Sequence, residues 1–326
     1  MIFTVNDNND EKPVIIIEEK PELTQEQAES ETPVIVIEND GEDDKGNQPV
    51  PPKQHHRWPW AVGSAVVTAL ICLAAAFGYR HYNKYVNIGV PTSITSEENI
   101  AKLQKPVDKS VKPEVVMTTD SVLGVMLNFY ELRGLKAEIS FKQPSHHDKD
   151  VYLYSRSCDF TSYDPKENQY IGSLVENGKE LQSDVSRLGY CAMANDNVVI
   201  GIARDEAVKD YCLEQGGSFF RQFILVSNGT LPSQFYLHGK VERRALGRMS
   251  DKLYYIESAD KETMWDFADA IREYGFIDAI YITGGADYCY YRTADGQAHD
   301  IGDINLKKSE HKSNGIIPWV VFKKRG

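Results

Sequence analysis

The chain has 326 residues, of which 41% are hydrophobic and 26% are charged, and its formal net charge is −12. This length accommodates one sizeable folded domain together with additional segments. Residues 1–52 contain 14 acidic residues and three lysines, so the rest of the chain is close to neutral. No basic stripe is present, and nucleic acid is therefore excluded as a predicted partner.

Residues 1–57 form a predicted disordered tail, because they are rich in Glu, Asp, Gln and Pro and can bury little apolar surface. The run PVIIIE at residues 13–18 recurs as PVIVIE at residues 33–38. A β-branched run that ends in an acid is suited to adding a strand to the edge of a partner's sheet, and it resembles the SUMO-interacting motif. We expect the tail to dock a protein partner; a duplicated spacer is the alternative.

Residues 58–80 are predicted to form a transmembrane helix. The stretch 61–79 contains no charged residue, and aromatic residues flank both of its ends. A slight excess of basic residues before the stretch predicts a cytoplasmic N-terminus and an exported C-terminal domain. The protein would then be a single-pass membrane protein with a stalk over residues 81–117. A buried helix is the alternative.

Residues 118–326 are predicted to form a single globular domain of the α+β class, with a mixed β-sheet and a few helices. One helix is expected over Leu123–Tyr130 and a second over Thr263–Tyr274. Apolar or alternating runs predict strands at residues 135–141, 151–154, 198–203, 219–226, 279–282 and 319–322.

The second helix has well-defined ends in the sequence. Thr263 and Asp266 form a capping-box pattern, and Gly275 occupies the position where a left-handed residue ends a helix. Between them, apolar residues recur at the helical spacing and predict one buried face.

The order of motifs in residues 240–296 resembles the phosphodiester glycosidase family. Members read roughly R-x-A-[IL]-G, then a strand and a helix, then A-[IL]-x-[IL]-D-G-G-G-S. Residues 243–247, RRALG, match the first motif, and residues 279–287, AIYITGGAD, stand in for the second. Thr283 replaces the family's Asp, and Ala286-Asp287 replace its Gly-Ser. The resemblance covers about residues 120–325.

This resemblance implies a hydrolase that cleaves a sugar phosphodiester in extracellular or cell-surface glycan. A guanidinium fork suits phosphate, and a Gly-Gly turn allows backbone N–H groups to approach a ligand. The implied substrate-binding residues are Arg243, Arg244, Arg221, Gly284, Gly285, Thr283 and Tyr288. The implied catalytic residues are Asp287 and Asp159, of which one would act as general acid. Since adjacent residues of a strand face opposite ways, Arg243 and Arg244 are not both expected in the site.

Because Thr283 stands in place of the family's Asp, a non-catalytic carbohydrate-binding or structural module of the same fold is the alternative. The sequence specifies no cofactor, and no C-x-x-C pair indicates a metal site. Residues 146–148, HHD, are interpreted as a solvated loop in preference to a metal ligand set. Cysteines 158, 191, 212 and 289 are compatible with two disulfides or with buried free thiols.

Overall fold

The computed structural model describes residues 58–81, 94–302 and 315–326, apart from residues 163, 165, 236, 238 and 286. The side chains of residues 58–63, 80 and 81 are outside this description. The predicted tail also lies outside it, so its disorder and its docking role stay predictions. The boundaries at residues 80 and 117 stay predictions as well.

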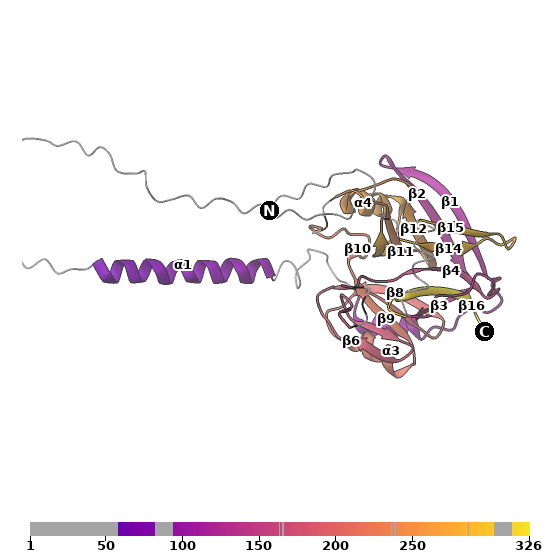
Figure 1. Ribbon diagram of the computed structural model, residues 1–326, viewed down its shortest axis with the longest axis horizontal. Helices are drawn as coiled ribbons and strands as arrows, with labels where there is room; N and C mark the ends of the chain where they lie inside the picture. Colours follow the sequence, from indigo (N-terminus) through magenta and orange to yellow (C-terminus); the bar gives the residue numbers. More distant parts are fainter. Residues whose placement is uncertain are drawn as a thin grey trace, which may run out of the picture. The chain divides into compact units, whose positions relative to one another are not determined.

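The described strands form three antiparallel sheets (Figure 1). Sheet A has the strand order β1-β2-β12-β11-β13-β10. Its strands are β1 (Glu114–Val122), β2 (Val125–Arg133), β10 (Ile224–Val226), β11 (Arg243–Met249), β12 (Lys252–Ser258) and β13 (Asp278–Gly284).

Sheet B has the strand order β15-β14-β4-β16-β3, and sheet C has the order β6-β5-β9-β7-β8. The strands of sheet B are β3 (Leu135–Ser140), β4 (Val151–Arg156), β14 (Cys289–Arg292), β15 (Ala298–Ile301) and β16 (Trp319–Lys324). The strands of sheet C are β5 (Leu174–Glu176), β6 (Lys179–Gln182), β7 (Gly189–Ala194), β8 (Asn197–Ile202) and β9 (Ser218–Gln222).

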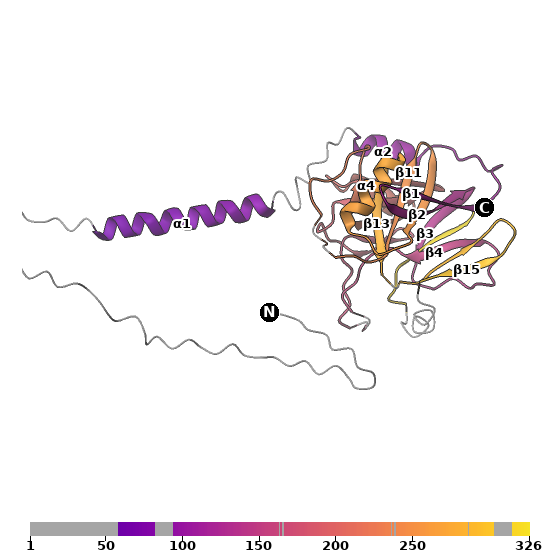
Figure 2. The same ribbon diagram turned by 90° about the horizontal axis from the view of Figure 1, so that it is seen from above.

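Four helices are described: α1 (Trp58–His81), α2 (Ser96–Leu103), α3 (Ala207–Glu214) and α4 (Met264–Tyr274). Helix α4 packs on sheet A, beside β10 and β11 in Figure 1, and α3 lies beside β9 of sheet C. Helix α2, labelled in Figure 2, packs on sheet C through the fully buried Leu103. Helices α2, α3 and α4 thus cover the sheets and leave the apolar centre to strands.

The sequence prediction for α4 is confirmed. The N–H group of Asp266 donates to the Thr263 hydroxyl at 3.0 Å, and Gly275 ends the helix with φ of 114°. The buried face consists of Met264, Phe267, Ala268, Ala270 and Ile271. A satisfied N-cap and one apolar stripe therefore fix both the ends and the orientation of this helix.

The largest core cluster is shared by all three sheets. Ile280 of sheet A, Leu153 of sheet B and Phe220 of sheet C belong to it, and each has no exposed surface. Because every sheet contributes to one apolar centre, the sheets are held against each other by burial of apolar surface.

Two of the places where the chain crosses between sheets lie close together. Phe223 separates β9 of sheet C from β10 of sheet A, and residues 285–288 separate β13 of sheet A from β14 of sheet B. The Gln222 amide lies 3.4 Å from the Ile282 carbonyl oxygen, which brings the ends of β9 and β13 together. Polar side chains at these strand ends gather in one place.

The predicted α+β class with a single mixed sheet is wrong, because the described domain is mostly β and has three antiparallel sheets. The strand predictions near residues 135, 151, 198, 279 and 319 are confirmed individually. The run at residues 219–226, predicted as one strand, is instead two strands, β9 and β10, in different sheets. Short strands alone do not tell which of them pair, and three small sheets give the same local patterns as one larger sheet.

The helix predicted over Leu123–Tyr130 is a β-hairpin. Strands β1 and β2 pair from Glu114↔Arg133 to Val122↔Val125, and Leu123 and Gly124 turn with φ of 51° and 83°. Two positive φ values are typical of a type I′ turn, for which Asn-Gly is the usual sequence. A leucine in the first position concealed the turn.

The prediction of a transmembrane helix over residues 58–80 is also wrong. Within the part of the chain that the structure describes, no helix is long and apolar enough to cross a membrane. The hydrocarbon core of a bilayer requires about 20 consecutive apolar residues, and the described side chains of α1 cover only residues 64–79. The expected single-pass topology, with its cytoplasmic N-terminus and exported domain, is therefore withdrawn.

All five cysteines are free thiols, and the four in the domain are buried. Of the two alternatives for these four cysteines, the structure has buried free thiols and not disulfides. Burial raises the pKa of Cys158, Cys212 and Cys289 to about 12 each, so these thiols are protonated near neutral pH.

We expect Gly134→Ala to lower the free energy of unfolding by about 2 kcal/mol. Gly134 has φ of 59°, and a Cβ atom there would lie 2.5 Å from the Val111 carbonyl oxygen. Gly216→Ala is the matched control, because Gly216 has φ of 66° and no atom within 4 Å of its Cβ position. Urea denaturation of both variants separates the clash from the shared backbone strain; equal losses would contradict the clash.

Candidate functional site

Charged and polar side chains converge where the strand ends of the three sheets meet. We call this group the acid–guanidinium cluster. Its members are Arg156, Asp159, Gln222, Arg244, Glu257, Thr283 and Asp287.

The outer part of the cluster is built around Arg156, the last residue of β4. Its Nη2 atom lies 2.9 Å from Asp287 Oδ2 and 3.8 Å from Asp159 Oδ1. The Gln222 amide donates to Asp159 Oδ2 at 3.1 Å. Since the Arg156 and Asp287 side chains are 19% and 13% exposed, solvent reaches this part of the cluster. One guanidinium thus holds two carboxylates at the protein surface.

Asp287 has an unusual electrostatic environment. Desolvation by burial raises its pKa above the ordinary value, although the positive charges of Arg156 and Arg244 and the Thr283 side chain act in the opposite direction. The neighbouring Asp159 carboxylate adds to the increase. A carboxyl group with a raised pKa beside a second carboxylate is a recognised arrangement for acid–base chemistry.

The inner part of the cluster is a buried ion pair. Arg244 Nε donates to Glu257 Oε1 at 3.1 Å, and the two residues face each other directly in β11 and β12. Arg244 is 1% exposed, and its Nη1 atom has no hydrogen-bond partner among the described residues. Burial raises the pKa of Glu257, which Arg244 opposes. An unused guanidinium nitrogen in the interior is costly unless something else compensates it.

Arg243 is buried, but its side chain serves the neighbouring loop. Nε donates to the Glu262 carbonyl oxygen at 3.0 Å, and Nη2 donates to the Gly239 carbonyl oxygen at 2.6 Å. Its guanidinium also lies over the Tyr281 ring, 5.8 Å from the centroid. Alternation along β11 therefore sends Arg243 to the loop and Arg244 to the cluster.

The Gly-Gly turn makes close backbone contacts within the chain itself. A Cβ atom on Gly284 would lie 2.6 Å from the Glu242 carbonyl oxygen, and the Gly285 N–H group donates to that same oxygen at 2.8 Å. The glycines thus permit the end of β13 to pass the start of β11. The N–H group of Gly285 is used in this contact.

Two other predicted residues point elsewhere. Tyr288 belongs to the aromatic group on the other face of sheet B, and its hydroxyl lies 2.9 Å from His146 Nε2. Arg221 forms an ion pair with Glu206, which precedes α3. Arg221 and Gln222 are successive residues of β9, so their side chains leave the strand on opposite faces.

Among the predicted site residues, the structure brings together Asp159, Asp287, Thr283 and Arg244. Sequence reasoning missed Arg156, Gln222 and Glu257. A signal existed for Arg156 and Gln222, since each is a polar residue at the end of an apolar strand. Glu257 lies inside a buried strand, and its pairing with Arg244 depends on a register that the sequence does not specify.

In the cluster, a group that can bind an anion, the Arg156 guanidinium, contacts an acid, Asp287. A guanidinium can hold phosphate or carboxylate oxygens, and a protonated Asp287 could donate to a leaving oxygen. Within the described residues, no three His, Cys, Asp or Glu side chains are placed to hold a metal ion together. His146 instead contacts the hydroxyl groups of Tyr154, at 2.7 Å, and Tyr288.

No protein-family description matches this chain, and no curated protein matches it either. Solved structures give distant likenesses. One is the zebrafish N-acetylglucosamine-1-phosphodiester alpha-N-acetylglucosaminidase catalytic domain, auto-inhibited by its pro-peptide, with 12% identity and a TM-score of 0.47 over 68% of this chain and 85% of that chain. Another is a hypothetical protein from Synechocystis, with 8% identity and a TM-score of 0.46 over 68% of this chain and 64% of that chain. Since both TM-scores lie below 0.5, neither likeness carries an argument about what this chain does.

Proposed function

We propose that the chain is a hydrolase that cleaves a phosphodiester attached to a sugar, with the acid–guanidinium cluster as its active site. One observation carries this proposal: a partly exposed aspartic acid with a raised pKa, Asp287, lies against a guanidinium and beside a second carboxylate, Asp159. An acid, an anion holder and a second carboxylate are the groups that such a cleavage requires.

The substrate's phosphate group would bind Arg156, the exposed guanidinium of the cluster. This binding competes with the 2.9 Å contact between Arg156 and Asp287. Once that contact is lost, burial of Asp287 is less compensated, and its pKa rises further. Anion binding therefore favours the protonated form of Asp287 at the moment when a proton donor is needed.

The remaining groups then have defined roles. In the proposed step, water attacks the anomeric carbon of the sugar while the bond from that carbon to the phosphate oxygen breaks. Asp287 donates its proton to the departing phosphate oxygen, and Asp159 accepts a proton from the attacking water, so the proton count balances. Gln222 orients Asp159 through the 3.1 Å hydrogen bond. Arg244 lies beneath and supplies positive charge toward the site, while Glu257 keeps it in place.

A non-catalytic module that binds an anionic carbohydrate is the second candidate. The observation that favours it is the same 2.9 Å ion pair, because a carboxylate held by a guanidinium is stabilised in its ionised form and cannot donate a proton. The two functions differ in turnover and can be separated by measuring it.

We expect Asp287→Asn to lower kcat by about 10²- to 10⁴-fold with little change in KM, because it removes a general acid. The substrates are the methyl diesters of glucose 1-phosphate and N-acetylglucosamine 1-phosphate, with released sugar measured by chromatography. Asp120→Asn, an exposed residue of β1, is the matched control. Binding of these diesters without turnover by the unaltered protein would support the binding module instead.

The raised pKa of Asp287 also predicts a pH dependence of stability. The folded protein keeps this proton to a higher pH than the unfolded chain, whose carboxyl has the ordinary value of 3.8. The contribution of Asp287 to the free energy of unfolding therefore falls as pH rises from 3.8 through the folded pKa. We expect Asp287→Asn to flatten the decline in this interval, measured by urea denaturation at each pH. Parallel curves for the two proteins would contradict the raised pKa.

A matched pair of arginine variants tests which arginine serves the cluster. Arg244→Gln removes a positive charge that lowers the pKa of Asp287, so we expect that pKa to rise. Arg243→Gln removes contacts to loop carbonyl groups and should leave that pKa unchanged. Carbon-detected NMR titration of the Asp287 carboxyl measures both. A rise in the Arg243 variant alone would reverse the assignment.

A further inference from the structure

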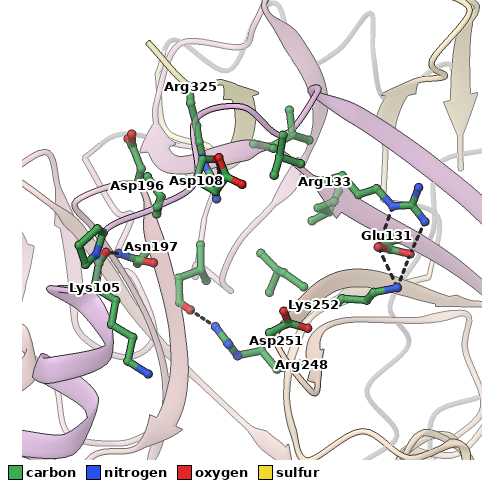
Figure 3. Close-up of a pocket in the computed structure, with 18 residues that line it drawn as sticks. Lys105, Asp108, Glu131, Arg133, Asp196, Asn197, Arg248, Asp251, Lys252 and Arg325 are labelled. Carbon is green, nitrogen blue, oxygen red and sulfur yellow. Dashed lines mark hydrogen bonds and ion pairs between the residues drawn. The ribbon is translucent and has the colours of Figure 1, made fainter.

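A pocket lies at the other end of β11 from the acid–guanidinium cluster (Figure 3). Its volume is about 500 Å³, within the range of small-molecule sites. Arg248, near the end of β11, lines this pocket, whereas Arg244 belongs to the cluster. Four residues of strand separate them by about 13 Å at roughly 3.3 Å per residue.

Distant segments of the chain build the walls. They are the segment after α2, the turn between β2 and β3, the turn between β7 and β8, the turn between β11 and β12, and Arg325 near the C-terminus. Because these segments belong to sheets A, B and C and to their connections, the pocket exists only in the assembled domain.

Two arginines in the pocket have acidic neighbours only at longer range: the charge of Arg248 acts on Asp278, and the charge of Arg325 acts on Asp108. Arg248 Nη1 donates to the Val198 carbonyl oxygen at 2.8 Å, and Arg325 Nη1 donates to the Asp108 carbonyl oxygen at 3.2 Å. Within the described residues, no carboxylate forms an ion pair with Arg248 or Arg325. Figure 3 shows them on facing sides of the pocket. Each guanidinium is thus held by one backbone contact and keeps other N–H groups for a ligand.

A third side of the pocket is electrically balanced. Glu131 accepts hydrogen bonds from Arg133 at 2.7 and 2.9 Å and lies 3.3 Å from the Lys252 ammonium. Arg133 also pairs with Glu114 at 3.0 Å. The contacts of Arg133 and Lys252 with Glu131 are drawn as dashed lines in Figure 3. The charges on this side of the pocket largely cancel each other. The positive charge available to a ligand therefore comes from Arg248, Arg325 and Lys105, which also lines the pocket.

Besides Glu131, the carboxylates of Asp108, Asp196 and Asp251 line the pocket. Asp108 Oδ1 accepts hydrogen bonds from the Ser110 N–H and hydroxyl groups at 2.8 and 2.6 Å. Asp196 and Asp251 lie in the turns that follow β7 and β11, and neither forms an ion pair with a described residue. An ionised carboxylate is a hydrogen-bond acceptor, so it suits a hydroxyl donor and repels a second anion. These carboxylates therefore repel an anion without hydroxyl groups, such as inorganic phosphate. An anion with hydroxyl groups can bind the arginines through its charge and donate hydrogen bonds to the carboxylates.

The lining also excludes some ligand classes. None of the residues that line the pocket is aromatic, so it has no surface on which a base could stack. Its polar side chains do not suit an apolar ligand. We propose that this pocket binds a small anionic polyol of the sugar-phosphate class, with the phosphate group between Arg248 and Arg325 and its hydroxyl groups on Asp196 and Asp251.

Calorimetric titration of the full chain tests this proposal with three probes: glucose 6-phosphate, inorganic phosphate and glucose. Glucose 6-phosphate should bind more tightly than inorganic phosphate, and glucose should not bind measurably. Arg248→Gln and Arg325→Gln should each weaken glucose 6-phosphate binding by about tenfold, as expected for loss of a charge-assisted hydrogen bond. Arg272→Gln on the exposed face of α4 is the matched control and should leave the affinity unchanged.

An acid variant separates the two kinds of contact. Asp251→Asn should leave or strengthen inorganic phosphate binding, because it removes a negative charge, and it should weaken glucose 6-phosphate relative to phosphate. Gluconate tests whether a carboxylate replaces the phosphate group. Glucose 6-phosphate that binds the acid–guanidinium cluster instead would lose affinity in Arg156→Gln and keep it in Arg248→Gln and Arg325→Gln, so failure of this proposal is distinguished from failure of the proposed hydrolase. Absence of binding at millimolar glucose 6-phosphate, or an affinity in Arg248→Gln and Arg325→Gln equal to that of the unaltered protein, would overturn the proposal.

Discussion

Arg244 and Glu257 face each other across two central strands of sheet A, with almost no exposure to solvent. Transfer of two charges from water into a protein interior is expensive, and it is tolerated only where the partners are held in a fixed geometry. Removal of either partner of such a pair typically costs about 3–5 kcal/mol, because the other charge is left uncompensated. The register of β11 against β12 is therefore set by electrostatics as well as by apolar packing.

This constraint extends to the surface through Asp287. The Arg244 charge lowers the pKa of Asp287, while Arg156 contacts the same carboxylate from outside. Charged groups therefore follow one another from the interior to the solvent: the Arg244–Glu257 ion pair, then Asp287, then Arg156. A change of charge at Arg156 or Arg244 therefore shifts the pKa of Asp287.

The elements that the sequence predicted correctly are those with local signals. Helix α4 has its cap, its periodicity and its terminal glycine within thirteen residues, and those signals suffice. The hairpin at Leu123 and Gly124 was wrongly predicted as a helix, because its turn has a leucine where asparagine is usual. The flanking apolar residues then fit a helical spacing. The number of sheets was predicted wrongly, because the pairing of strands that are distant in the chain gives no local sequence pattern.

The site was predictable only in part for the same reason. Asp159 and Asp287 were found because each follows an apolar strand, and the structure places both beside Arg156. Alternation in β11 indicated that only one of Arg243 and Arg244 could serve the cluster. Which one does so depends on the loop carbonyl groups that bind Arg243, and their position is a tertiary fact.

The crossings of the chain between sheets also bear on how the protein folds. Gln222 meets Asp159 from 63 residues away and Ile282 from 60 residues away. Contacts of such separation close long loops, and their entropic cost must be met before the contact contributes. The cluster therefore cannot exist in an intermediate in which only hairpins and α4 have formed. Ligand binding at this cluster would consequently report the last step of folding and act as a probe of the fully assembled domain.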